Sequence, residues 1–256
     1  MSRIEEIFRA KKKRLLNVYC TAGYPEVDST LTVLKALQDS GVDMIEIGMP
    51  YSDPLADGPV IQKSSTIALA NGMSVSRLFD QLQDFRKSIT VPVILMGYMN
   101  PILQYGFEKF CANAAAAGID GLILPDLPMY EFETEYGAII RKHRLDFIFL
   151  VTPETSEERI KKLDELTSGF LYAVSSSSTT GRDKNMMNVK TYLQKLENLK
   201  LRNPVLVGFG IKDKESFNDA CQYASGAIIG TAFIKALETS TSIEKSVKQF
   251  MDGILA

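Results

Sequence analysis

The stretch Asp43-Met44-Ile45-Glu46-Ile47-Gly48 has the composition of a short β-strand that is apolar except for one carboxylate in its middle. Short runs rich in Val, Ile and Leu are typical of strands buried on both faces of a parallel sheet. Seven more such runs are spread along the chain, at Leu16–Cys20, Val93–Gly97, Gly121–Leu124, Phe147–Val151, Phe170–Val174, Val205–Gly208 and Ala227–Ile229. We therefore predict eight parallel strands.

Amphipathic helical stretches separate these runs. Leu31, Leu34 and Leu37 recur at helical spacing, with Asp28 as a candidate N-cap and Gly41 as a stop signal. The same pattern is formed by Leu78, Leu82 and Phe85 after Ser74, and by the segment Glu157–Leu166. Strand and helix thus alternate from one end of the chain to the other.

Eight β/α units in 256 residues leave little room for a second domain. The predicted fold is a single right-handed (β/α)8 barrel, or TIM barrel, over residues 1–256. An extra helix with Ile4, Ile7 and Phe8 on one face precedes the first strand and is predicted to cover the barrel floor. An open doubly wound sheet is the alternative.

The composition excludes several classes of function. The net charge is −2, so the basic surface of a nucleic-acid-binding protein is absent, and no apolar run is long enough for a membrane span. The three cysteines and the single histidine are not in metal-binding spacing. A reducing cytoplasm and a small-molecule substrate are therefore expected.

Glu46 is the strongest candidate catalytic residue. Side chains alternate along a strand, so Glu46 and Met44 face the same way. Barrel active sites lie at the carboxyl ends of the strands, and burial raises the pKa of a carboxyl toward the range useful for proton transfer. The structural alternative is a buried glutamate paired with a cation, but no lysine or arginine ends a strand nearby.

The loop after this strand, Pro50–Pro59, contains two more carboxylates, Asp53 and Asp57, among three prolines. It is either a stiffened part of the site or a solvated turn. Later, Gly208 and Gly210 follow the seventh strand, while Gly230 and Thr231 follow the eighth. Glycines in these two loops, with a helix beginning at Thr231, are typical of a barrel phosphate site, although glycine also serves turn geometry.

The sixth strand leads into a small polar stretch, residues 175–182, which suggests a lid or else a serine-rich linker. No lysine lies in or at the end of a strand, which disfavours a Schiff-base aldolase, and the absence of a metal cluster disfavours a zinc aldolase. Cleavage of a carbon–carbon bond here would depend on acid–base groups and on a substrate that accepts electrons itself.

The run from Glu46 to Pro59 closely resembles the signature of the tryptophan synthase alpha subunit family. Other stretches agree in order along the whole chain: Thr21-Ala22-Gly23-Tyr24-Pro25, Met99-Asn100-Pro101, Pro125-Asp126-Leu127-Pro128, Thr180-Gly181 and Gly208-Phe209-Gly210. The resemblance implies retro-aldol cleavage of indole-3-glycerol phosphate to indole and glyceraldehyde 3-phosphate in tryptophan biosynthesis.

The resemblance also implies roles for individual residues. Glu46 matches the acid–base, Asp57 the partner of the indole N–H, and Tyr172 a positioning tyrosine. The phosphate cradle is matched by Gly181, Gly210, Gly230 and Thr231, and the indole pocket by Tyr19, Ile61 and Tyr98.

A partner is implied as well. Members of the family pair with a beta subunit, typically in an alpha2beta2 tetramer, and pyridoxal phosphate is expected in that subunit and no cofactor in this chain. The contacts are implied to come from Pro50–Gly58, Asn100–Tyr105 and Pro125–Tyr130, with Asp53, Asn100 and Pro128 as contact residues. Asp53 is a candidate partner for a lysine of the beta subunit.

Three other functions compete with this one. The first is a stand-alone lyase that releases free indole, and the second is an inactive subunit that only activates a beta partner. Intact Glu46 and Asp57 argue against the second. The third, another phosphosugar barrel such as an isomerase, receives no support from the motif after the second strand.

Overall fold

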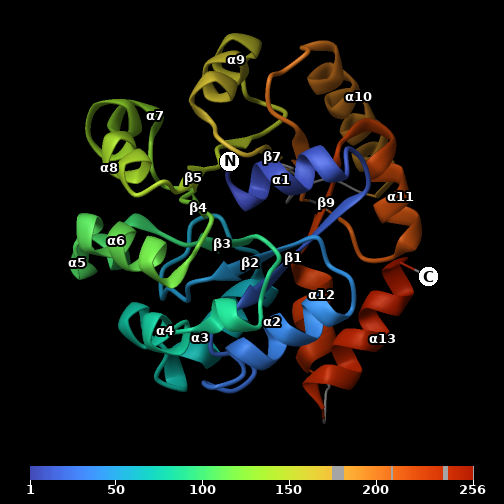
Figure 1. The fold of residues 1–256 in the computed structure, drawn as a ribbon. Helices are drawn as coiled ribbons and strands as arrows, with labels where there is room; N and C mark the ends of the chain where they lie inside the picture. Colours follow the sequence, from blue (N-terminus) through green and yellow to red (C-terminus); the bar gives the residue numbers. More distant parts are fainter. Residues whose placement is uncertain (175–181, 209, 239–241, 256) are drawn as a thin grey trace.

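The structure is a computed structural model that describes residues 1–174, 182–208, 210–238 and 242–255. Within these ranges, parallel strands occupy the centre of the molecule and helices form a ring around them (Figure 1). The strands are β1 (Leu15–Thr21), β2 (Met44–Gly48), β3 (Val93–Met96), β4 (Gly121–Ile123), β5 (Asp146–Phe147), β6 (Leu150–Val151), β7 (Leu171–Ala173), β8 (Val205–Val207) and β9 (Gly226–Ile229).

The order of the strands in the sheet is β5-β4-β3-β2-β1-β9-β8-β7-β6, and every pair is parallel. The predicted fifth strand, Phe147–Val151, is present as two short pieces, β5 and β6. β5 pairs with β4, and β6 pairs with β7. Because one segment of chain bonds to both ends of the sheet, it closes the eight predicted strands into a barrel, as expected from the sequence.

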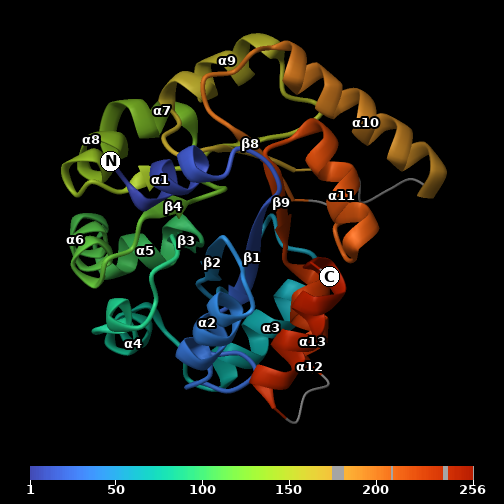
Figure 2. The ribbon, with the colours of Figure 1, turned by 45° about the vertical axis from the view of Figure 1, so that its right-hand side comes forward.

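The helices follow the strands in alternation, as the sequence predicts. They are α1 (Arg3–Ala10), α2 (Thr30–Asp39), α3 (Pro59–Ala70), α4 (Val75–Gln81), α5 (Met99–Tyr105), α6 (Phe107–Ala117), α7 (Met129–Glu131), α8 (Gly137–Lys142), α9 (Glu157–Leu166), α10 (Arg182–Asn198), α11 (Lys214–Tyr223), α12 (Thr231–Glu238) and α13 (Ile243–Leu255), with a short 3-10 helix η1 (Phe85–Lys87) and a π-helical segment η2 (Phe132–Tyr136). Figure 2 shows the C-terminal helices α12 and α13 beside α2 and α3, next to the paired first and last strands β1 and β9.

Two apolar cores hold the barrel together. The larger lies between the strands and the ring of helices. The smaller fills the inside of the barrel and consists of Leu15, Met44, Ile94, Ile123, Ile148, Phe170, Tyr172, Leu206 and Ile228, closed by Ile4 of α1. Ile7 and Phe8 pack against this inner core as well, so α1 covers the barrel floor as predicted. The ring of Phe8 lies 6.0 Å from that of Phe170.

The start of α2 differs from the prediction. Asp28 is not its N-cap, since the helix begins at Thr30 and the cap position is Ser29. The Asp28 carboxylate instead accepts hydrogen bonds from Arg77 and Gln81, which both lie in α4. Leu31, assigned to the apolar face, is 37% exposed. Val33, Leu34, Ala36 and Leu37 form the buried face instead.

None of the helices in the described ranges combines the length and the apolar character needed to cross a lipid bilayer.

We predict that Ile4→Ala lowers the free energy of unfolding by about 2–5 kcal/mol, because it opens a cavity in the inner core at a fully buried position. Leu31→Ala, on the exposed side of α2, is the control and should cost less than about 1 kcal/mol. Urea unfolding of the two variants measures the difference. Equal losses would mean that α1 does not close the barrel core.

Candidate functional site

The inner face of the barrel carries a small polar group between its apolar layers. Glu46 lies on β2 with the same orientation as Met44, and therefore projects into the barrel. It lies close to the carboxyl end of the strand, where the loop to α3 begins. Asn17 lies on the adjacent strand β1 and also faces inward, because it alternates with Leu15 of the inner core. Both side chains are completely buried.

Glu46 is held by a single hydrogen bond. The Asn17 Nδ2 donates to Glu46 Oε1 at 2.5 Å, while Glu46 Oε2 has no hydrogen-bond partner in the described part of the chain. Burial raises the pKa of Glu46 to about 8, and the hydrogen bond from Asn17 partly opposes that rise. No ion pair to Glu46 occurs among the described residues. Among the described residues the glutamate is therefore not half of a buried salt bridge, and its raised pKa makes it a candidate for proton transfer.

Asp57 lies in the loop between β2 and α3 and is half-buried. Burial raises the pKa of its carboxyl, and a hydrogen bond from the Tyr98 hydroxyl acts in the opposite direction. That hydroxyl also accepts the Ala56 N–H at 3.0 Å. Tyr98 thus fixes both the backbone before Asp57 and its carboxylate.

Two tyrosines complete the wall around the acids. The pKa of Tyr172, on β7, is raised first by burial and then by the nearby charges of Glu46, Tyr19 and Asp57. The ring of Tyr19 occupies the space over Gly48, where a Cβ would lie only 1.9 Å from the tyrosine hydroxyl.

The ring of Tyr172 lies over Gly208 in the same way, since a Cβ there would be 2.3 Å from its hydroxyl. Glycine is therefore required at the ends of β2 and β8 so that the two rings can enter the barrel mouth.

The predicted phosphate residues follow β8 and β9. Gly210 has a positive φ of 67°, and no atom of the described residues lies within 4 Å of the position of a Cβ on it. Gly230 lies next to Tyr19 and Ile61, 3.5 and 3.6 Å from its Cβ position. Thr231 is the first residue of α12, so the N-terminus of that helix points to the same region. Residues 175–181 of the predicted lid stretch, Gly181 among them, lie outside the described residues.

The residues expected to contact a partner are exposed at the rim. Asp53 and Pro128 lie in loops, and Asn100 in α5 donates to the Tyr51 hydroxyl at 2.9 Å. The Tyr51 ring in turn lies 5.4 Å from that of Tyr98. Three large apolar side chains are exposed in the same three segments: Leu55 at 88%, Leu103 at 48% and Tyr130 at 71%.

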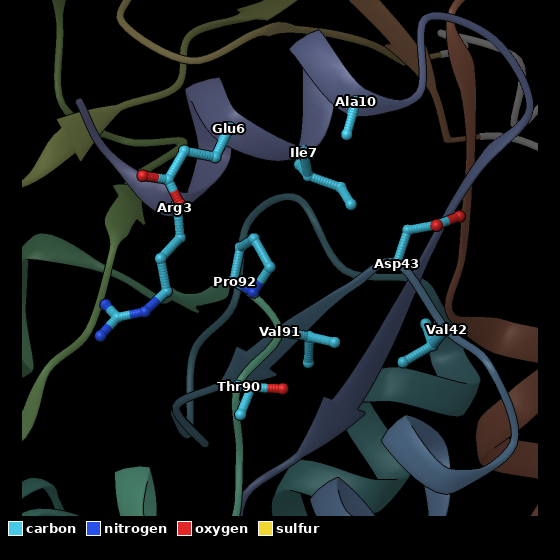
Figure 3. A pocket seen from close by; sticks show the side chains of 9 residues that line it. All are labelled: Arg3, Glu6, Ile7, Ala10, Val42, Asp43, Thr90, Val91 and Pro92. Atoms are coloured by element: carbon cyan, nitrogen blue, oxygen red, sulfur yellow. The ribbon is translucent and has the colours of Figure 1, made fainter.

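The pocket in Figure 3 lies elsewhere, at the amino ends of the strands. It is lined by residues of α1 and by those that precede β2 and β3: Arg3, Glu6, Ile7, Ala10, Val42, Asp43, Thr90, Val91 and Pro92. The Asp43 carboxylate in its wall is already bonded to the Lys11 ammonium at 2.6 Å and to the Leu16 N–H at 2.8 Å. These bonds give Asp43 a structural role, and the pocket has no contact with Glu46.

Sequence reasoning missed Asn17, the residue that bonds to Glu46. A signal was present, because an asparagine interrupts an otherwise apolar strand in phase with Tyr19. The partner itself becomes visible only from the register, in which Asn17 lies opposite Met44 and Tyr19 opposite Glu46.

Comparisons with known proteins agree over nearly the whole chain. The family model described as tryptophan synthase alpha chain matches residues 6–253. The tryptophan synthase alpha chain of Flavobacterium johnsoniae is 54% identical over 243 residues, which are 94% of this chain and 96% of the relative. That of Parabacteroides distasonis is 48% identical over 255 residues, 99% of each chain.

Solved structures give the same result. Tryptophan synthase subunit alpha from Legionella pneumophila superposes with a TM-score of 0.89 at 35% identity, covering 99% of this chain and 97% of that one. A chain of tryptophan synthase from M. tuberculosis gives a TM-score of 0.86 at 32% identity, covering 99% and 100%. Agreement in sequence and in fold leads to one conclusion: this chain belongs to the tryptophan synthase alpha chain family.

Proposed function

We propose that this chain cleaves indole-3-glycerol phosphate into indole and glyceraldehyde 3-phosphate, with Glu46 as the acid–base. The family is one of carbon–carbon lyases. The observation that carries the proposal for Glu46 is a fully buried carboxyl on the inner face of β2 whose pKa is raised to about 8. Such a group exchanges a proton readily near neutral pH.

The reaction needs two proton transfers, and one carboxyl can supply both. Protonated Glu46 donates its proton to indole C3, which makes the ring an electron acceptor. The resulting carboxylate then removes the proton from the hydroxyl on the adjacent glycerol carbon. As the aldehyde forms, the bond between that carbon and indole C3 breaks, its electron pair restores the indole ring, and Glu46 is protonated again.

Asp57 is proposed to accept a hydrogen bond from the indole N–H. Positive charge develops on the ring when C3 is protonated, and a nearby carboxylate stabilises that charge most strongly in the transition state. The hydrogen bond from Tyr98 and the contact of that hydroxyl with the Ala56 N–H support this role, since they orient the carboxylate in advance.

The remaining site residues bind and orient the substrate. Tyr19, Ile61 and Tyr98 would line the indole pocket, with Tyr172 as a positioning group beside Glu46. Gly210, Gly230 and Thr231 would hold the phosphate through backbone N–H groups and the N-terminus of α12, and Gly181 would reach it from the other side. The closeness of Gly230 to Ile61 and Tyr19 supports a phosphate site that adjoins the indole pocket.

A beta subunit is the proposed partner, in an alpha2beta2 tetramer located in the cytoplasm. That subunit would carry pyridoxal phosphate and consume the indole, while this chain needs no cofactor of its own. The exposed Leu55, Leu103 and Tyr130 support a docking face, because they lie in the three segments that contain Asp53, Asn100 and Pro128. Exposed apolar groups gathered in this way are typical of an interface.

Glu46→Gln should lower the cleavage rate at least about 10²-fold, because an amide of the same size cannot carry a proton. Steady-state release of indole measures the loss, and the affinity for glycerol 3-phosphate serves as the control for an intact site. A variant that keeps more than about a tenth of the parent rate would remove Glu46 from the mechanism.

The same variant should become more stable than the parent protein as the pH rises. The folded pKa of about 8 lies above the ordinary value of 4.5, so the folded protein holds this proton more tightly than the unfolded chain. The parent therefore loses stability between about pH 4.5 and 8, and Glu46→Gln does not. We expect an advantage of about 1–4 kcal/mol at pH 8 that vanishes below pH 4.5. Urea unfolding across this range tests it.

Asp57→Ala should lower the rate about 10- to 100-fold, the loss expected for a hydrogen bond to a charged group, and leave glycerol 3-phosphate affinity unchanged. Asp57→Asn is the matched variant. It keeps an acceptor for the indole N–H without the charge, so its rate should fall between those of the parent and Asp57→Ala. Parallel losses of rate and of glycerol 3-phosphate affinity would instead mean that Asp57 maintains the loop.

Adding the cognate beta subunit should raise the cleavage rate at least about tenfold, or ~1.4 kcal/mol of barrier. Leu55→Asp and Asp53→Ala should reduce this activation more than the basal rate, because both side chains lie on the proposed docking face. Leu31→Asp, on the exposed side of α2, is the control and should be activated normally. If the beta subunit neither binds nor accelerates the chain, the stand-alone lyase is the correct function.

A further inference from the structure

The hydrogen bond between Asn17 and Glu46 joins two side chains that are both completely inaccessible to solvent. Buried polar side chains in this protein usually hold the backbone of a loop. The Asp164 carboxylate, for example, accepts the N–H groups of Arg202 and Asn203, and the Asp120 carboxylate accepts the N–H of Val93. Those two residues have clear structural roles.

Asn17 is different, because the hydrogen bond that its side chain makes among the described residues is directed at Glu46. It bonds to no loop and to no backbone group there, and its own Oδ1 has no partner. Burying an amide with its oxygen unpaired costs stability. An apolar side chain would satisfy the inner core better at this place, between Leu15 and Tyr19 on the inward face of β1.

The groups that surround Glu46 leave Asn17 as its main polar neighbour. Among the described residues, three titratable side chains lie close to Glu46: Tyr19, opposite it in the register of β1 and β2, Cys20 on β1 and Tyr172 on β7. Burial raises the pKa of Cys20 to about 12 and the pKa of each tyrosine well above its ordinary range, so all three are neutral at physiological pH. On the other side, Ile94 of β3 is opposite Glu46 in the register. No cation in the described residues is paired with the carboxylate.

We propose that Asn17 is a positioning residue for Glu46, holding Oε1 through its amide so that Oε2 is the oxygen that exchanges the proton with the substrate. The inference rests on the proposed function, in which Glu46 is the acid–base. It adds which carboxylate oxygen of Glu46 exchanges the proton, and it names Asn17 as the residue that determines this.

This arrangement serves both states of the acid–base. In the protonated state the proton resides on Oε2, and Oε1 is a carbonyl oxygen that still accepts from Asn17 Nδ2. In the ionised state the same hydrogen bond stabilises the carboxylate, which needs a donor because it is buried. Glu46 can therefore give up and regain its proton without changing its partner or its rotamer.

The first test uses the unmodified protein. The side-chain ¹H–¹⁵N signals of Asn17 should shift with pH and show the same midpoint as the ¹³C carboxyl signal of Glu46. In Glu46→Gln the Asn17 signals should remain constant over that range. Asn17 signals that do not follow the Glu46 titration would overturn the proposal, whatever the activity of the protein.

The second test removes the donor with little change of shape. In Asn17→Leu the carboxylate loses its stabilising hydrogen bond, so the Glu46 midpoint should move up by about one pH unit or more. The limb of the pH–rate profile that follows Glu46 should move by the same amount. At pH 7 kcat should fall about tenfold, with KM changed by less than about threefold.

Thr21→Val is the matched control for this variant. Thr21 is buried in the same strand, and its hydroxyl is 2.7 Å from that of Ser64. Its replacement should cost stability without moving the Glu46 midpoint. An equal shift in both variants, or none in Asn17→Leu, would reduce Asn17 to a packing residue. Activity retained in Glu46→Gln would instead reject the proposed function and leave the NMR result on Asn17 standing.

Discussion

The site depends on one constraint, the burial of a carboxyl group inside an apolar barrel. Glu46 sits on the inner face of β2, in the same row of side chains as Met44 of the inner core, and receives one hydrogen bond there. A charge in such a place is unfavourable, so the group keeps its proton to a higher pH than it would in water. The same burial that weakens the fold makes the residue suited to proton transfer, a conflict that is common at functional sites.

The tyrosines around Glu46 can pack there only because the backbone has glycine at two positions. Tyr19 and Tyr172 reach the acids because Gly48 and Gly208 carry no side chain at the points where the rings pass. Asp57 comes from a loop rather than a strand, and Tyr98 ties it to the barrel rim. A strand of the barrel therefore holds Glu46, while Asp57 lies on a connecting loop, a kind of segment that is in general more mobile than the strands.

Much of this arrangement could be predicted from the sequence. Apolar runs identified the strands, and a carboxylate inside one of them identified Glu46, because both signals are local. The features that sequence analysis got wrong or missed depend on contacts between residues far apart in the sequence, or on a choice between two similar neighbouring residues. Ser29 occupies the N-cap position of α2 without a side-chain capping hydrogen bond, while the Asp28 carboxylate accepts from Arg77 and Gln81, which are distant in the sequence. The break in the fifth strand and the pairing of Asn17 with Glu46 follow from the closure and register of the sheet, which a single strand does not encode.

Because the fifth strand is broken, the barrel is closed by two short strands, β5 and β6. β5 and β6 attach to their neighbours through ladders of only two residues each, whereas β1 and β2 share five aligned pairs. In the order of the sheet, β1 is in the middle, and β5 and β6 are the two ends that the segment from β5 to β6 joins. Side-chain packing offsets the short ladders, because the rings of Phe147 and Phe149 lie 4.6 and 4.9 Å from the ring of Phe132. Aromatic contacts on the outside of the sheet therefore hold the barrel closed at the place where it has the fewest backbone hydrogen bonds.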